Sequence, residues 1–165
     1  MLYDGDHRRQ AAACLIEANN TAFVRLERGK FRHQAHFRMV FEDLPEDRNY
    51  VRLSDDKTKP EVHFVDHSDY TKKGIERMRQ ELPKILSCLP VEDITYLKPY
   101  STESHILGTT RMSSDPETGV VDKNLIHHKF RNLFVLGSGS FTTYAPANPT
   151  LTLSALSLYA ADKSF

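Results

Sequence analysis

The 165-residue sequence has only two cysteines, no excess of charge of either sign and no long hydrophobic run. Cys14 and Cys88 stand far apart, which excludes a metal knuckle or a disulfide framework and favours a reducing compartment such as the cytoplasm. No stretch approaches the ~20 apolar residues of a membrane helix, so we expect no membrane segment. The 22 basic residues balance 22 acidic ones, which argues against nucleic acid as a partner.

The first half of the chain predicts helices around a small antiparallel sheet. Residues 8–17 are rich in helix formers and follow Asp6, a plausible N-cap, so they predict a first helix. Alternating apolar segments with short connections predict three antiparallel strands at residues 35–41, 50–53 and 61–65. Apolar residues at helical spacing after Ser68 or Asp69 predict a second helix, near residues 69–87, that packs on these strands.

The end of the chain predicts a strand, a turn and a helix, which together make half a unit of an α/β sheet. Residues 132–136 are an apolar run that predicts a buried strand, in a different sheet from residues 36–65. A small-residue turn, residues 137–140, follows the strand. Residues 150–162 are apolar nearly all round and predict a buried final helix. The expected fold class is α+β.

The glycines of this turn prompt a search for phosphate-binding and nucleophile motifs. Gly137-Ser138-Gly139 lacks the third glycine of a dinucleotide-binding turn, and no helix follows it directly. Ser138 is not part of a G-x-S-x-G elbow, which argues against a serine hydrolase that would use Ser138 with His105. The eight histidines show no ligand spacing, so no metal site is predicted.

Two other segments point to chemistry on a hydroxyl group. They are residues 104–112, which contain His105, and residues 147–152, which contain Asn148. Taken singly, His105 has an ordinary explanation as a core histidine, and Asn148 as the cap of the last helix. Brought to one pocket, the imidazole would be a base for the hydroxyl proton, and the carboxamide a donor for the resulting oxyanion.

Seven motifs stand in a characteristic order: His105, Gly108-Thr109, Met112, Gly119-Val120-Val121-Asp122, Leu133-Phe134-Val135, Asn148-Pro149 and Ala160-Ala161-Asp162. This order, over residues 104–162, resembles the C-terminal part of the glucose-methanol-choline (GMC) flavin oxidoreductases. Residues 41–54 are similar to a strand pair of the family's substrate domain. The resemblance implies that residues 1–130 belong to the substrate domain. It also implies that residues 131–165 form the last strand, turn and helix of a Rossmann-like FAD-binding domain.

The resemblance also implies an activity, a cofactor and site residues. FAD would be the cofactor and an alcohol or a sugar the substrate. His105 would remove the hydroxyl proton, and Asn148 would hold the alkoxide oxygen. The residues implied in cofactor binding are Gly137, Ser138, Asn148, Pro149 and Thr150.

The family's phosphate-binding G-x-G-x-x-G turn does not occur in this sequence. We therefore expect a fragment, a truncated product or one piece of a split enzyme, with a separate N-terminal FAD-binding half as partner. We also expect no tight FAD binding by the chain alone. The alternative is a catalytically inactive fragment that acts as a binding or scaffold module.

Overall fold

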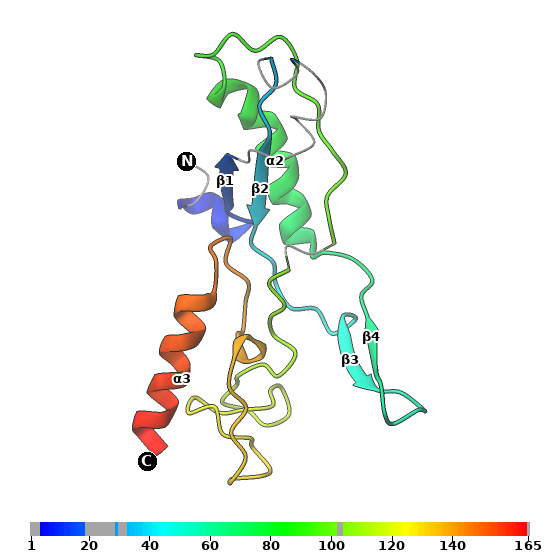
Figure 1. Ribbon diagram of the computed structural model, residues 1–165, viewed down its shortest axis with the longest axis vertical. Coiled ribbons are helices and arrows are strands. Elements are labelled where there is room, and N and C mark those ends of the chain that lie inside the picture. Colours follow the sequence, from blue (N-terminus) through cyan, green and yellow to red (C-terminus); the bar gives the residue numbers. More distant parts are fainter. Residues whose placement is uncertain (1–3, 19–28, 30–32, 102–103, 165) are drawn as a thin grey trace.

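The computed structural model describes residues 4–18, 29, 33–101 and 104–164. Its elements, in chain order, are the 3-10 helix η1 (Asp6–Arg9), strands β1 (Cys14–Ala18), β2 (Phe37–Phe41), β3 (Tyr50–Leu53) and β4 (Pro60–His63), helix α2 (Asp69–Ile85), the 3-10 turn η3 (Ser138–Ser140) and helix α3 (Thr150–Ser164). In the described part, β1 pairs with β2 and β3 with β4 in two small antiparallel sheets (Figure 1). The α+β class is therefore confirmed.

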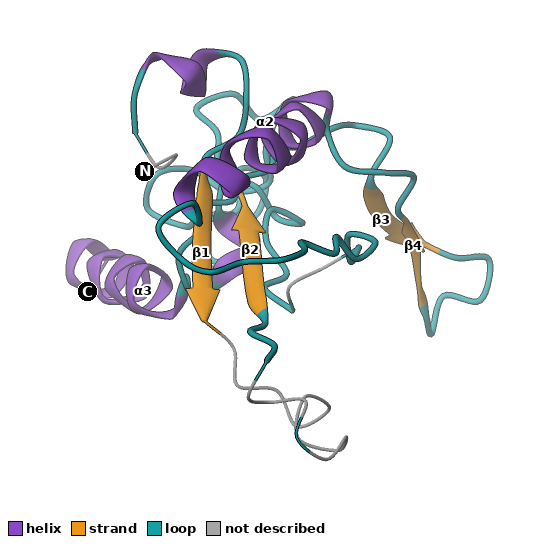
Figure 2. Ribbon diagram, turned by 90° about the horizontal axis from the view of Figure 1, so that it is seen from above, coloured by secondary structure: helices purple, strands orange, loops and turns teal. Residues whose placement is uncertain are grey.

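The β1–β2 pair has two unlike faces, because successive residues of a strand point to opposite sides. One face packs on Met78 and Leu82 of α2. It carries Cys14, Ile16, Met39 and Phe41. Seen from above in Figure 2, α2 lies against this pair, whereas the β3–β4 hairpin projects to one side. The face turned away from α2 is left open to line a cavity.

Helix α2 agrees with its prediction in position and packing. Ser68 is the N-cap, since its side chain accepts a hydrogen bond from the backbone N–H of Thr71 at 3.2 Å. Gly74 lets the helix approach the chain before β1, because a Cβ at this position would lie 2.7 Å from the Cβ of Ala12. The helix thus holds the edge of the β1–β2 sheet through a close backbone contact.

The predicted helix over residues 8–17 is wrong, because its second half forms β1. The buried run from Ala11 to Cys14 lies between β2 and α2, and the backbone N–H of Glu42 donates to the carbonyl of Ala13 at 3.1 Å. Pairing with β2 outweighs the helix propensity of the alanines. The three predicted strands do form, but β2 pairs with β1, and β3 with β4, so they do not share one sheet.

The second half of the chain departs from prediction in two ways. The expected strand at residues 132–136 does not form a ladder: in the described part of the chain, this run is joined to residues 125–127 by one isolated bridge, between Ile126 and Phe134. Helix α3 forms as predicted, but it is not buried: Leu151 is 84% exposed and Leu158 73% exposed. Only one stripe of the helix has partners, where Ala160 packs in the second core cluster.

Candidate active site

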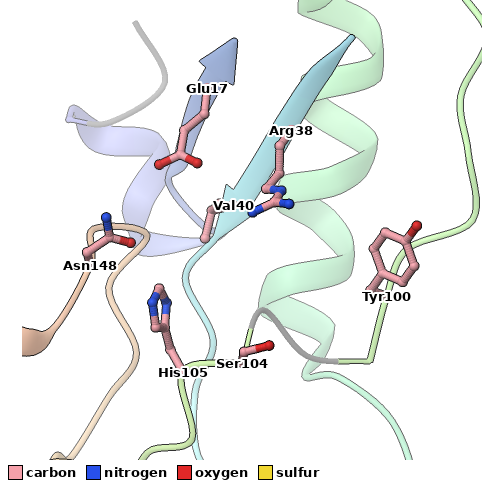
Figure 3. Close-up of a pocket in the computed structure, with 7 residues that line it drawn as sticks. All are labelled: Glu17, Arg38, Val40, Tyr100, Ser104, His105 and Asn148. Atoms are coloured by element: carbon pink, nitrogen blue, oxygen red, sulfur yellow. The ribbon is translucent and has the colours of Figure 1, made fainter. Parts of the chain in front are cut away.

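A cavity of about 440 Å³ lies against the open face of the β1–β2 sheet. Its lining residues are Glu17, Arg38, Val40, Tyr100, Ser104, His105 and Asn148 (Figure 3). The strands supply the first three. Tyr100, Ser104 and His105 come from the loop after α2, and Asn148 stands two residues before the start of α3. All except Val40 carry a polar or charged group, so the cavity suits a ligand that forms hydrogen bonds.

His105 is half-buried on the wall of this cavity. Its Nδ1 lies 3.1 Å from the hydroxyl oxygen of Tyr144, at hydrogen-bond distance. Ser104, directly before it, has a positive φ of 65°, which turns the chain sharply at the cavity edge. The Tyr144 contact engages Nδ1. No described residue forms a hydrogen bond to Nε2, so a ligand could use this nitrogen.

Tyr144 is itself held by Asp43 through backbone hydrogen bonds. The N–H of Asp43 donates to the carbonyl of Tyr144 at 3.3 Å, and the N–H of Tyr144 donates to the carbonyl of Asp43 at 3.2 Å. The Asp43 carboxylate also accepts a hydrogen bond from the Thr71 hydroxyl at 2.8 Å. Burial alone would raise the pKa of Asp43, but hydrogen bonds from Ser68 and Thr71 lower it below its usual value.

The same carboxylate supports a second part of the cavity wall. Nδ1 of His67 lies 3.1 Å from Asp43, and Nε2 of His67 lies 3.1 Å from the carbonyl oxygen of Tyr100. Tyr100 lines the cavity. Asp43 therefore connects α2 to both wall segments, one through Tyr144 and one through His67.

Glu42, the preceding residue, joins the N-terminal segment to β2 and α2. Its buried carboxylate accepts hydrogen bonds from the N–H of Ala13 at 2.9 Å and the Tyr70 hydroxyl at 2.8 Å, and it pairs with Arg8. Burial alone would raise the pKa of Glu42, but these three partners hold it below its usual value. This cluster fixes β1 beside β2 and so fixes one side of the cavity.

Two of the sequence motifs run side by side, joined by hydrogen bonds. The hydroxyl of Ser138 donates to the carbonyl of Ile106 at 2.9 Å, and the N–H of Thr110 donates to the carbonyl of Gly139 at 2.9 Å. Gly139 must be a glycine, because a Cβ there would collide with the Thr110 side chain. The segment that carries His105 is therefore anchored to the turn of η3.

The structure brings together some of the predicted site residues but not all. His105 and Asn148 both line the cavity, although a strand and two loops were expected to separate them in the sequence. The other predicted cofactor-binding residues, Gly137, Ser138, Pro149 and Thr150, are not among its lining residues. The hydroxyl of Ser138 and the ring of His105 bind different partners, which does not favour the serine hydrolase alternative.

Sequence reasoning missed five residues of this site: Glu17, Arg38, Val40, Tyr100 and Tyr144. The sequence predicts a helix at Glu17, so it gives no sign of the register between Glu17 and Arg38. Tyr144 stands four residues before Asn148 in a loop without periodicity, and no signal in the sequence points from it to His105. The one clue in the sequence is the alternation of side chains along the strand at residues 37–41, which places Arg38 and Val40 on the same face of the sheet.

Comparison with known proteins agrees with the order of the motifs. A family model described as GMC oxidoreductase matches residues 45–157. The chain belongs to the GMC oxidoreductase family. It is 33% identical to the fructose dehydrogenase large subunit of Gluconobacter japonicus over 96% of this chain and 34% of that protein. It is 32% identical to 2-methyl-1,2-propanediol dehydrogenase of Mycolicibacterium austroafricanum over 79% of this chain and 25% of that protein.

A shorter match reaches the pyranose 2-oxidase of Lyophyllum shimeji, which is 39% identical over 39% of this chain and 10% of that protein. The chain thus spans about a third or less of the length of these GMC relatives. Within the described ranges, no helix is long and apolar enough to cross a membrane. Those same residues contain no group of three or more His, Cys, Asp or Glu side chains that could hold a metal ion.

Proposed function

We propose that the chain forms the substrate-binding and flavin-facing part of an FAD-dependent oxidoreductase that oxidises a CH–OH group of an alcohol or a sugar. The observation that carries this proposal is the polar cavity that His105 and Asn148 line together, in a chain of the GMC family. The names of three relatives support it, since they refer to fructose, a propanediol and a pyranose, all of which carry hydroxyl groups.

The chain's own groups fit the ring end of FAD better than its phosphates. Asn148 lies at the cavity just before α3, and the N-terminal end of a helix favours negative charge. Gly137 has a positive φ of 105° and open space where a Cβ would stand, which allows close approach of a ligand. When bound, FAD supplies the acceptor for the two electrons and the hydrogen that leave the substrate carbon.

The roles of the protein groups follow from their hydrogen-bonding capacities. For Nε2 of His105 to accept the substrate hydroxyl proton, Nδ1 must carry a hydrogen and donate it to the Tyr144 oxygen. The amide NH₂ of Asn148 would donate to the substrate oxygen as negative charge grows on it. General-base assistance of this kind accelerates a reaction by roughly 10² to 10⁴-fold.

The exposed apolar residues around α3 support the proposal of a separate FAD-binding half. These residues are Leu133, Leu136, Leu151, Leu158 and Tyr159. Large apolar patches are uncommon on an isolated soluble domain and mark surfaces that a partner covers. We propose that the FAD-binding half covers α3 and completes the sheet that residues 132–136 do not form here.

The test uses this chain assembled with its FAD-binding half. His105→Ala should slow flavin reduction by the substrate at least ~100-fold, and Asn148→Ala should slow it less. His63→Ala on β4 is the matched control, because it removes an exposed histidine remote from the cavity lining. An unchanged rate of flavin reduction in His105→Ala would rule out its role as the base and favour the scaffold alternative.

A further inference from the structure

The cavity contains a pair of opposite charges that the proposed chemistry does not use. Glu17 and Arg38 are direct register partners in the β1–β2 sheet. Cross-strand partners project from the same face, here the face turned away from α2. Figure 3 shows both side chains reaching from the strands toward the space that His105 and Asn148 border.

The two side chains together offer donors and acceptors but no net charge. The Glu17 carboxylate only accepts hydrogen bonds, whereas the Arg38 guanidinium only donates them. Neighbouring hydroxyls of a sugar or polyol do both, so one such ligand can form hydrogen bonds to both side chains at once. A plain aliphatic alcohol has a single hydroxyl, so it would exclude water from the two charged groups and replace fewer of their hydrogen bonds to water. An anionic ligand would be attracted by Arg38 and repelled by Glu17, so the pair would not offset the cost of removing the charge of that ligand from water.

The position of the pair on strands makes it a rigid feature of the cavity. Behind Glu17 and Arg38, the opposite face of the sheet is fixed by the core around Met78 and Leu82. At the end of β2, the Glu42 cluster holds the N-terminal segment in place. Sites on strands keep their geometry better than sites on loops, which is what selection between similar ligands requires.

We propose that Glu17 and Arg38 form a hydroxyl-binding subsite that selects a neutral, polyhydroxylated substrate and leaves one of its hydroxyls at His105. The proposal rests on the proposed function for the orientation of the substrate. Binding at the subsite needs no oxidation step, however, so it can be tested on the chain alone. The subsite distinguishes sugars and polyols from simple alcohols and from sugar acids.

The first experiment is an NMR titration of the ¹⁵N-labelled chain with D-fructose, D-gluconate and 1-butanol. We expect saturable shifts at the Arg38 side-chain N–H and at the β1–β2 backbone with fructose, weaker binding of gluconate, and no saturable shift with butanol. Glu17→Gln and Arg38→Met should each weaken fructose binding about tenfold or more, because each removes hydrogen bonds to a charged group. Arg52→Met is the matched control, since Arg52 pairs with Glu61 on the separate β3–β4 hairpin.

Three results would overturn the subsite. They are the absence of saturable fructose shifts in the parent chain, equal binding of butanol, and unchanged fructose binding in both folded variants. Thermal unfolding of each variant shows whether it is folded. Arg38→Lys serves as a second variant, because it keeps the charge and stem but loses the planar fork of donors.

A second experiment separates this proposal from the proposed function. In the chain assembled with its FAD-binding half, Arg38→Met should raise the KM for fructose and leave flavin reduction at saturating fructose nearly unchanged. His105→Ala should instead lower the rate of flavin reduction itself. If His105→Ala keeps the parent rate, the proposed function fails. If Arg38→Met keeps the parent KM, the subsite fails even for an enzyme that oxidises sugars.

Discussion

At the residue scale, the Tyr144 hydroxyl governs which nitrogen of His105 faces the cavity. Tyr144 Oη lies 3.1 Å from Nδ1, and the backbone of Tyr144 is bridged to Asp43. A histidine can act as a base through Nε2 only if its hydrogen sits on Nδ1. In the mechanism that we propose, the proton acceptor His105 thus depends on a tyrosine that itself takes no proton from the substrate.

We expect Tyr144→Phe to shift His105 away from the Nδ1–H tautomer, because the acceptor for that hydrogen is lost. Long-range ¹H–¹⁵N correlation spectra of the imidazole nitrogens measure the tautomer directly. His127 is an internal reference, since its Nδ1 accepts hydrogen bonds from the N–H of Lys129 and that of Phe130 at 3.0 and 3.2 Å, which fixes the opposite tautomer. If His105 matches His127 in the parent chain, our assignment of its tautomer is wrong.

Also at this scale, we expect the Glu42 carboxylate to make stability depend on acidity. Its pKa is lowered on folding from the usual 4.5, so its ionised form stabilises the native state above that pH. This stabilisation is lost as the pH falls through the lowered pKa. Melting temperatures measured from neutral to acid pH should fall less steeply in Glu42→Gln, which should already be less stable at neutral pH. Glu117→Gln, at an exposed site, should follow the parent curve.

At the scale of elements, the fold depends on how closely α2 approaches the chain before β1. Gly74 of α2 lies against Ala12, and the N–H of Ala12 donates to the carbonyl of Tyr70 in the first turn of the helix at 3.1 Å. This contact sets the distance between α2 and the sheet.

We expect Gly74→Ala to destabilise the chain by roughly 1–3 kcal/mol, although alanine is the better helix former. The added Cβ would lie 2.7 Å from the Cβ and 2.8 Å from the carbonyl oxygen of Ala12, so the helix must move. Urea unfolding followed by circular dichroism gives the free energy of unfolding. Lys73→Ala is the control at an exposed position of the same helix, and it should change stability little. A Gly74→Ala chain that is more stable than the parent would contradict the close packing.

At the scale of the whole molecule, the chain belongs to the GMC family, but its sequence contains no G-x-G-x-x-G turn for a pyrophosphate. It spans 34% of the length of the fructose dehydrogenase large subunit to which it is similar. Around α3 it exposes large apolar side chains, among them Leu151 and Leu158. Both features support the proposal that a separate FAD-binding half packs against this chain.

We expect the isolated chain not to bind FAD with micromolar affinity, because the pyrophosphate would find no glycine-rich turn before a helix. Titration of the chain into FAD, followed by flavin fluorescence, measures this directly. Addition of the FAD-binding half should restore flavin binding and protect α3 from hydrogen exchange. Stoichiometric quenching at low micromolar FAD by the chain alone would show that the expected dependence on a second half is wrong.

The sequence by itself determined α2 with a cap at Ser68 or Asp69, the position of α3, three of the four described strands and the family. These features rest on local periodicity, capping and motif order, which need no knowledge of distant residues. Only the tertiary structure decided that residues 14–18 pair with β2, that residues 132–136 lack a ladder, and that α3 is exposed. It also decided which residues meet His105 and Asn148 at the cavity. Strand pairing and burial depend on partners far along the chain, and helix propensity yields to them when an alanine-rich segment lies between a strand and a helix.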